Sequence, residues 1–343
     1  MRDTRVRYAP WFLLLLVAAW PLSADEPAAS KPFQLERCEL IPLPDHQVDF
    51  QIDGVQRTRW HYDAKYPRPF FYPLLGPSGT SLTRMGHPGA ANHDHHRSVW
   101  FAFNDVDGFT FWADGKGTSI RQKDWYAYED GDDHAIMSST CGWLDPEGNE
   151  LMQHDLVAAL IPGTAGQYAL ELQAEFRPGE DRDAVQLGKT NFGFLAVRVA
   201  KTLSTHFGGG QLSSSEGGVG EPEIFGKPAR WVDYSGPVAV GSGSQRTTQI
   251  EGITYFDHPD NPRYPTHWHV RADGWMGASF GMHEALEITT AKPLRLRYLL
   301  FIHSGPYDQQ ASQKVHTEFA ASQGFEIIKG QRNHRQFETR RIP

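Results

Sequence analysis

Short alternating segments joined by tight turns are the feature that most constrains the fold of this chain of 343 residues. Residues 48–52 alternate apolar and polar side chains, Asp53-Gly54 forms a turn pair that tolerates positive φ angles, and residues 55–62 run back. Antiparallel strands bury their apolar faces by stacking one sheet on another. The pattern therefore predicts an all-β fold, a large antiparallel β-sandwich with one or few peripheral helices. Further strand candidates are residues 93–103, 151–161, 167–176, 192–199, 247–256, 275–282 and 294–302.

One helix is predicted near the C-terminus. Asp308 can cap its first turn, Ala311, Val315 and Phe319 recur at a spacing of four residues, and Gly324 can end it. This spacing predicts a surface helix that packs on a sheet edge through those three side chains.

The N-terminal segment has the layout of a secretory signal peptide. Three arginines precede an apolar stretch over residues 11–22, which is too short to cross the roughly 30 Å of a bilayer core. We therefore expect residues 1–24 to be removed and residues 25–343 to fold as one exported domain, periplasmic or extracellular. The remaining sequence has no second apolar run long enough to span a membrane.

The net charge argues against one class of partner, and the cysteine content leaves a disulfide open. The first 24 residues carry three arginines and one aspartate, so the net charge of −8 becomes about −10 once they are removed. An acidic surface repels nucleic acid, so we expect no nucleic-acid partner. Cys38 and Cys141 can pair in an oxidising compartment or remain free, and the sequence leaves both the disulfide and the oligomeric state open.

The segment HDHHRSVWF, which begins at residue 93, carries the chemistry that draws most attention. If residues 93–103 are extended, His93, His95 and Arg97 share one face with the apolar residues that follow, and His96 lies on the other face. A second segment repeats the pattern, because His267, His269 and Arg271 also alternate. We expect the two segments to bring four imidazoles and two guanidinium groups to one hollow of the sandwich.

Two chemistries suit such a cluster. In an acid/base site, His95 or His269 would transfer protons with His93 and His267 as further catalytic candidates, and no cofactor is required. Arg97 and Arg271 would then anchor an acidic or hydroxyl group of the substrate. In the alternative, a divalent transition metal is bound by the four histidines at positions 93, 95, 267 and 269, although the two arginines would repel a cation.

Other side chains are candidates for binding a substrate. His87 lies in a loop rich in glycine before the first segment, and His96 lies within it. Trp231 and Trp268 could stack on a sugar ring, as amphipathic aromatic side chains do, although aromatic residues in a sandwich are more often core.

A tract rich in glycine and serine over residues 208–220 could supply a carboxylate partner for the histidines. Glu216, Glu221 and Glu223 lie in or just after this tract. The tract lacks the strand-to-helix context of a phosphate-binding loop, so nucleotide binding is not expected.

Several phrases of the sequence recur together in one known family. They cover residues 81–84, 93–98 with 100–101, 109–112, 229–236, 257–259 with 261–263, and 267–269. Together they resemble a family of secreted bacterial proteins of unknown function that is commonly labelled methane oxygenase PmoA. The resemblance runs from about residue 50 to 305 and implies a large β-sandwich similar to the galactose mutarotase superfamily, rather than a membrane oxygenase. In that superfamily a histidine acid and a carboxylate base flank a bound sugar; here the histidines match in kind, and the sequence assigns no carboxylate to the base position.

The leading hypothesis is therefore an exported carbohydrate-active enzyme, of epimerase, lyase or hydrolase type, that acts on a sugar or glycan through histidine acid/base chemistry. A metal-dependent enzyme and a non-catalytic sugar-binding or scaffold protein remain the alternatives.

Overall fold

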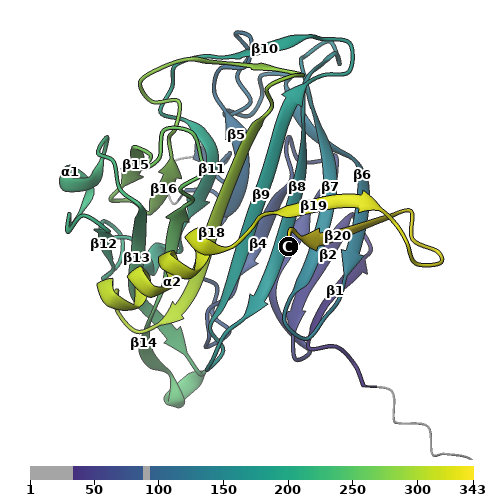
Figure 1. Ribbon diagram of the computed structural model, residues 1–343. Coiled ribbons are helices and arrows are strands. Elements are labelled where there is room, and N and C mark those ends of the chain that lie inside the picture. The colour runs from purple at the N-terminus through teal and green to yellow at the C-terminus, as the bar shows by residue number, and fades with distance from the viewer. Residues whose placement is uncertain (1–33, 88–92) are drawn as a thin grey trace, which may run out of the picture. The chain divides into compact units, whose positions relative to one another are not determined.

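Two large antiparallel sheets stack on each other in the computed structural model of this protein, which describes residues 34–87 and 93–343 (Figure 1). The prediction of an all-β sandwich is confirmed. Residues 36–343 form one compact unit. The predicted signal peptide, residues 1–24, lies outside the described residues.

The first sheet has eight strands and mixes the N-terminal third of the chain with later segments. Its strands, in spatial order, are β1 (Cys38–Leu43), β2 (Gln47–Ile52), β3 (Val55–His61), β4 (Phe70–Leu74), β5 (Val99–Phe103), β11 (Gly193–Arg198), β16 (Trp275–Ala278) and β15 (Trp268–Arg271). The β2–β3 hairpin turns at Asp53 and Gly54, which have φ angles of 51° and 72°, so the predicted turn is confirmed.

The second sheet also has eight strands, and most of them are longer. In spatial order they are β12 (Gln211–Ser214), β13 (Trp231–Val240), β14 (Thr247–Asp257), β18 (Leu294–Ser304), β9 (Tyr168–Pro178), β8 (Glu150–Pro162), β7 (Ala135–Leu144) and β6 (Ser119–Glu129). Smaller elements complete the fold: the pair β10 (Ala184–Leu187) and β17 (Leu286–Thr289), the hairpin β19 (Phe325–Lys329) and β20 (Phe337–Arg341), the helices α1 (Glu221–Ile224) and α2 (Gln309–Ala321), and the 3-10 turns Lys201–Leu203 and Gly243–Gln245.

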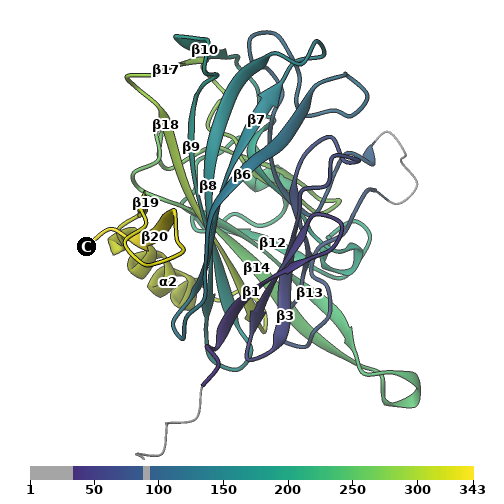
Figure 2. The same cartoon turned by 90° about the vertical axis from the view of Figure 1, so that its right-hand side faces the viewer.

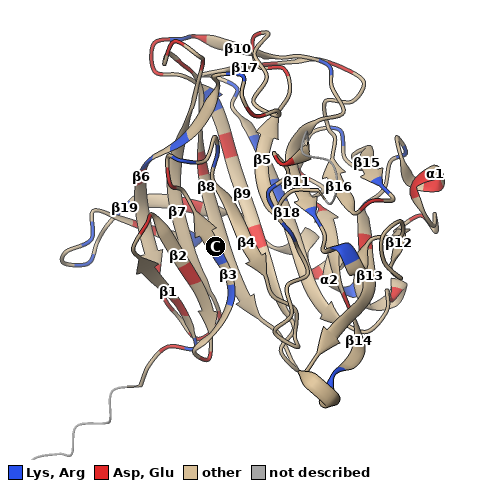
Figure 3. Cartoon of the chain, turned by 180° about the vertical axis from the view of Figure 1, so that it is seen from behind, with Lys and Arg blue, Asp and Glu red and all other residues tan. Residues whose placement is uncertain are grey.

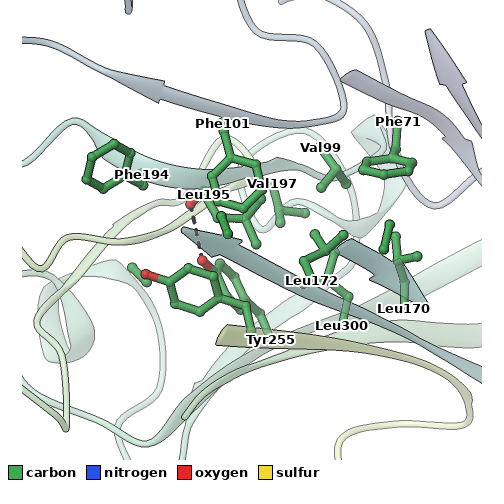
Figure 4. Packing of buried hydrophobic residues seen from close by; sticks show 14 of the residues in the cluster. Phe71, Val99, Phe101, Leu170, Leu172, Phe194, Leu195, Val197, Tyr255 and Leu300 are labelled. Carbon is green, nitrogen blue, oxygen red and sulfur yellow. Dashed lines mark hydrogen bonds between the residues drawn. The ribbon is translucent and has the colours of Figure 1, made fainter. Parts of the chain in front are cut away.

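The main core lies between the two sheets. Figure 4 shows Phe101 and Leu195 of the first sheet facing Leu172 and Leu300 of the second, and the Tyr255 hydroxyl donates a hydrogen bond of 3.2 Å to the Leu195 carbonyl. Burial of apolar area at about 25 cal/mol per Å² makes this layer the main stabilising contact of the fold.

The outer face of the second sheet is covered by the C-terminal elements. In Figure 2, α2, β19 and β20 lie on the side of this sheet that faces away from β1 and β3. Phe319 of α2 packs with Trp231, Phe256 and Leu299, and Phe325 of β19 packs with a second small cluster.

The predicted helix is confirmed, with three corrections. The Asp308 side chain accepts from the backbone N–H groups of Gln310 and Ala311, as an N-cap does. The helix ends at Ala321, before Gly324, and it packs on the face of the sheet rather than on its edge. Ala311 is exposed, so only Phe319 and, in part, Val315 face the sheet as expected.

The first sheet differs, because its outer face carries only a small apolar layer. Trp100 and Ala102 of β5, Ala196 of β11 and Trp275 of β16 form that layer with Phe70 and Trp112.

Among the described residues, no helix is long and apolar enough to cross a membrane.

Cys38 and Cys141 are both buried, and both are free in the structure. Burial raises the pKa of each thiol, because a thiolate is costly in an apolar environment. A thiol reagent should therefore label neither cysteine in the folded protein and both cysteines in denaturant without a reductant. Mass spectrometry after alkylation checks this, and a chain that takes up label only after reduction would show that the two cysteines are paired.

Candidate functional site

A pocket of about 700 Å³ opens on the outer face of the first sheet, above β5, β11, β15 and β16. Six histidines line it, together with four charged and four aromatic side chains, and with Asn104 and Ala272. The histidines are His87, His93, His95, His96, His206 and His269; the charged residues are Arg198, Glu221, Arg271 and Asp273; the aromatic residues are Trp112, Phe192, Phe207 and Trp275. The volume lies in the range of small-molecule sites.

Histidines of both predicted segments line this pocket, but the first segment is not the continuous strand that was predicted. Only Val99–Phe103 is a strand; His93 to His95 form a turn, in which the His96 N–H donates to the His93 carbonyl at 3.1 Å. The expected alternation over residues 93–98 is therefore wrong, and His93, His95 and His96 all line the pocket. They lie above the Trp100 face of the sheet, whereas Val99, Phe101 and Phe103 point into the main core.

Four imidazole rings are packed against one another at one end of the pocket. The ring centroids of His95 and His96 are 4.3 Å apart, those of His93 and His96 are 5.3 Å apart, and those of His87 and His93 are 5.3 Å apart. Burial, with the charges of His95 and Arg198, lowers the pKa of His96 to about 2. His96 is therefore neutral at ordinary pH, and its Nδ1, like that of His93, has no hydrogen-bond partner among the described residues.

Asp273 is the charged centre beside this histidine cluster. Its carboxylate accepts two hydrogen bonds from Arg198, at 2.8 and 3.2 Å, and one of 2.9 Å from His87 Nε2. Burial opposes ionisation, but these bonds and the Arg198 and His87 charges outweigh it and lower the pKa of Asp273 to about 2. The Arg198 side chain is 1% exposed, so this ion pair is fixed in the wall of the pocket.

His269 is held in one tautomer. Its Nδ1 lies 3.0 Å from the Asn191 carbonyl, which only accepts, so Nδ1 carries the proton and Nε2 is an acceptor. The Ser279 hydroxyl donates to the same carbonyl at 2.6 Å. Nε2 has no partner among the described residues, and burial lowers the pKa of His269 to about 4. His269 therefore lines the pocket as a neutral imidazole whose buried Nε2 is an acceptor without a partner among the described residues.

Arg271 and Glu221 form a second ion pair at the pocket. Arg271 Nη1 donates to Glu221 Oε1 at 3.0 Å, and the other carboxylate oxygen accepts from the Ala272 N–H at 2.7 Å. Glu221 begins the short helix α1 between β12 and β13, which Figure 3 shows in the red of acidic residues. Of the three glutamates considered from the sequence, only Glu221 lines the pocket. Glu216 pairs with Arg230, and Glu223 accepts from the Val219 N–H.

The aromatic wall consists of residues that the sequence did not single out. The ring of Trp112 lies 5.1 Å from that of Trp275 and 5.2 Å from that of Phe192, measured between centroids. Trp275 also contacts His96 and His269, at 4.9 and 5.9 Å. The wall therefore joins the two histidine groups.

Four of the predicted site residues lie elsewhere. Trp231 is buried under α2 on the second sheet, and Trp268 is buried in the main core with its Nε1 donating to the Ala229 carbonyl. Since neither side chain is exposed, neither can stack on a ligand. Arg97 pairs with Asp114, and His267 packs on His283 at 4.4 Å; neither lines the pocket.

The proposed metal ligands do not assemble. His267 lies apart from the pocket that His93, His95 and His269 line. Within residues 34–87 and 93–343, no group of three or more His, Cys, Asp or Glu side chains is arranged to hold a metal ion.

Fold and site together define a β-sandwich protein with an aromatic-walled pocket rich in histidine on the outer face of one sheet. A family model described as a family of unknown function (DUF6807) matches residues 47–317, and the chain belongs to that family. A search of curated proteins found no match.

The low pKa of His269 predicts a loss of stability in acid. The histidine at this position has a pKa near 6.5 in the unfolded chain and about 4 in the folded protein. Between these pH values the unfolded chain binds a proton at this side chain and the folded protein does not, so acid favours unfolding. We expect this single group to remove about 3 kcal/mol of the free energy of unfolding as the pH falls from 7 to 4. His269→Gln should lose correspondingly less over the same range, as urea unfolding at a series of pH values measures.

The comparison with the variant isolates His269, because His96, His154 and His258 are also buried with lowered pKa values and remain in both proteins. If the free energy of unfolding falls equally with pH in the two proteins, the lowered pKa assigned to His269 is contradicted.

Proposed function

We propose that the protein is an exported carbohydrate-active enzyme in which His269 exchanges protons with a sugar held in the pocket. The observation that carries this proposal is the fixed tautomer of His269, with Nδ1 donating to the Asn191 carbonyl and Nε2, in the pocket wall, without a partner in the part of the chain that the structure describes. A neutral imidazole in this state can take a proton from a hydroxyl or a C–H group and return it in a later step.

The histidine cluster supplies the complementary groups. His95 lines the same pocket, and we assign it the second proton transfer, with His93 and His96 as its neighbours. An epimerisation, an elimination and a hydrolysis each need one group that accepts a proton and one that donates it, and the two sets of histidines provide both.

Two carboxylates also line the pocket, and one of them, Glu221, is among the three glutamates that the sequence offered as partners for the histidines. The likeness to the galactose mutarotase superfamily implies a carboxylate beside the sugar, and both Glu221 and Asp273 line the pocket. Asp273 orients His87, whereas Glu221 orients Arg271. Glu221 is the better candidate for contact with a ligand, because Asp273 already accepts three side-chain hydrogen bonds.

The walls favour a sugar ring as the ligand. Trp112, Trp275 and Phe192 offer apolar ring surface, and the histidines and Asn104 offer hydrogen-bonding groups around it. Carbohydrates present apolar C–H faces and polar edges, and aromatic side chains beside polar groups suit both. The N-terminal segment has the layout of a signal peptide and supports export. The resemblance to the proteins labelled PmoA adds no methane chemistry to the proposal.

His269→Ala should lower turnover at least about 100-fold and leave sugar affinity changed far less, because the lost group acts on the proton rather than on binding. Nuclear magnetic resonance of a panel of glycans and keto-sugars detects epimerisation, elimination and hydrolysis in one experiment. His283→Ala is the matched control, since His283 is exposed and does not line the pocket. Turnover that survives in both His95→Ala and His269→Ala would remove the mechanism.

Phe192→Ala should weaken sugar binding about 10-fold, because the ring covers one wall of the pocket and is only partly buried. Trp125→Ala provides the comparison, since Trp125 is 51% exposed on β6 and lies outside the pocket. Calorimetry on the two variants measures the difference; equal affinities would show that the ligand does not use this wall.

A further inference from the structure

The charged side chains of the pocket are already paired with one another. Arg198 is bound by Asp273 through two hydrogen bonds, and Arg271 is bound by Glu221. Each lining arginine therefore has its own carboxylate, and among the described lining residues no arginine or lysine is left without one. A ligand that brings a further negative charge would have to displace one of these two carboxylates.

Two buried polar atoms of the pocket wall suit a ligand that carries hydroxyl groups. His269 Nε2 accepts only, because Nδ1 carries the proton, whereas Trp275 Nε1 donates only. Both are buried without a partner among the described residues, and an unmet buried group costs about 1–3 kcal/mol. A hydroxyl group can satisfy either atom, since it donates and accepts. A carboxylate has no proton to give, so it cannot bond to His269 Nε2.

The electrostatic setting points the same way. Burial keeps His96 and His269 neutral near pH 7, so neither supplies a positive charge. Asp273 stays ionised over the same range, but its charge is balanced by Arg198, as that of Glu221 is balanced by Arg271, so neither pair offers an incoming anion an uncompensated positive charge.

We infer that this pocket takes neutral polyhydroxylated rings and rejects sugar acids, and that Glu221 sets this selectivity by occupying the Arg271 guanidinium. The inference rests on the proposed function, in that it names the class of sugar the pocket receives. It makes Glu221 a specificity residue whose loss releases a cation at the pocket mouth, where Arg271 is 52% exposed.

Matched ligands test the inference on the full chain. One pair is an oligogalacturonate and the same oligomer with its carboxyl groups reduced to alcohols; a second pair is methyl glucuronide and methyl glucoside. Calorimetry should give at least about 10-fold tighter binding for the neutral member of a pair. Glu221→Gln should strengthen binding of the acidic member about 10-fold, because Arg271 is then free to pair with it.

Glu223→Gln is the control, because Glu223 belongs to the same short helix but does not line the pocket. Circular dichroism establishes that both variants are folded. If Glu221→Gln does not fold, the salt dependence of the wild-type protein replaces it: binding of the acidic member should not weaken between about 0.05 and 0.5 M salt, because no arginine or lysine among the described lining residues is free to attract it, and a clear loss of affinity with salt would overturn the inference.

The outcomes separate the two proposals. An acidic member that binds the wild-type protein as tightly as its neutral partner overturns the charge selectivity and leaves the proposed function standing. Tight binding of the neutral member without turnover supports the selectivity and overturns the enzyme. Failure of both members of every pair to bind overturns both.

Discussion

The packing of two large sheets through their inner faces is the constraint on which the other features depend. Each sheet has two faces, and the main core uses only the inner one of each. The C-terminal helix and hairpin cover the outer face of the second sheet, so the apolar side chains there are also buried. On the first sheet, within residues 34–87 and 93–343, loops rather than a helix or a hairpin pack on the outer face. Its outer face carries a small aromatic layer, and the pocket lies above that layer.

Local patterns predicted most of the fold. The Asp53-Gly54 turn and the Asp308 cap depend on a few neighbouring residues, and the structure has both. The turn at His93 could not be predicted in the same way, because contacts distant in the chain hold it. The Gly86 N–H donates to the His96 carbonyl, and the Ser98 N–H donates to the Arg84 carbonyl, so two segments fix each other. The alternation of residues 93–103 contains no information about these hydrogen bonds to residues 84–86, so it predicted a strand.

The candidate site was also predicted only in part. The histidine-rich segments predicted His93, His95 and His269, but the charged residues beside them lie in segments with no recognisable motif. Arg198 is a lone charge at the end of an apolar strand, and Asp273 belongs to the short turn between β15 and β16. The Asp273-Gly274 pair was a usable hairpin signal, and it would have placed a carboxylate beside Arg271. Trp231 and Trp268 show the opposite failure, because a tryptophan in a sandwich is more often core than surface, as both are here.

The loop that carries Glu221 belongs to the second sheet, yet it closes against the edge of the first. Gly226, Lys227 and Ala229 exchange backbone hydrogen bonds with Thr266 and Trp268, and Glu221 holds Arg271 and Ala272. A molecule that fills the pocket would therefore contact residues from the first sheet and from the loop of the second sheet that carries Glu221. Ligand occupancy and the cohesion of the two layers are thus thermodynamically linked, so a rise in melting temperature reports the correct ligand even before any reaction is known.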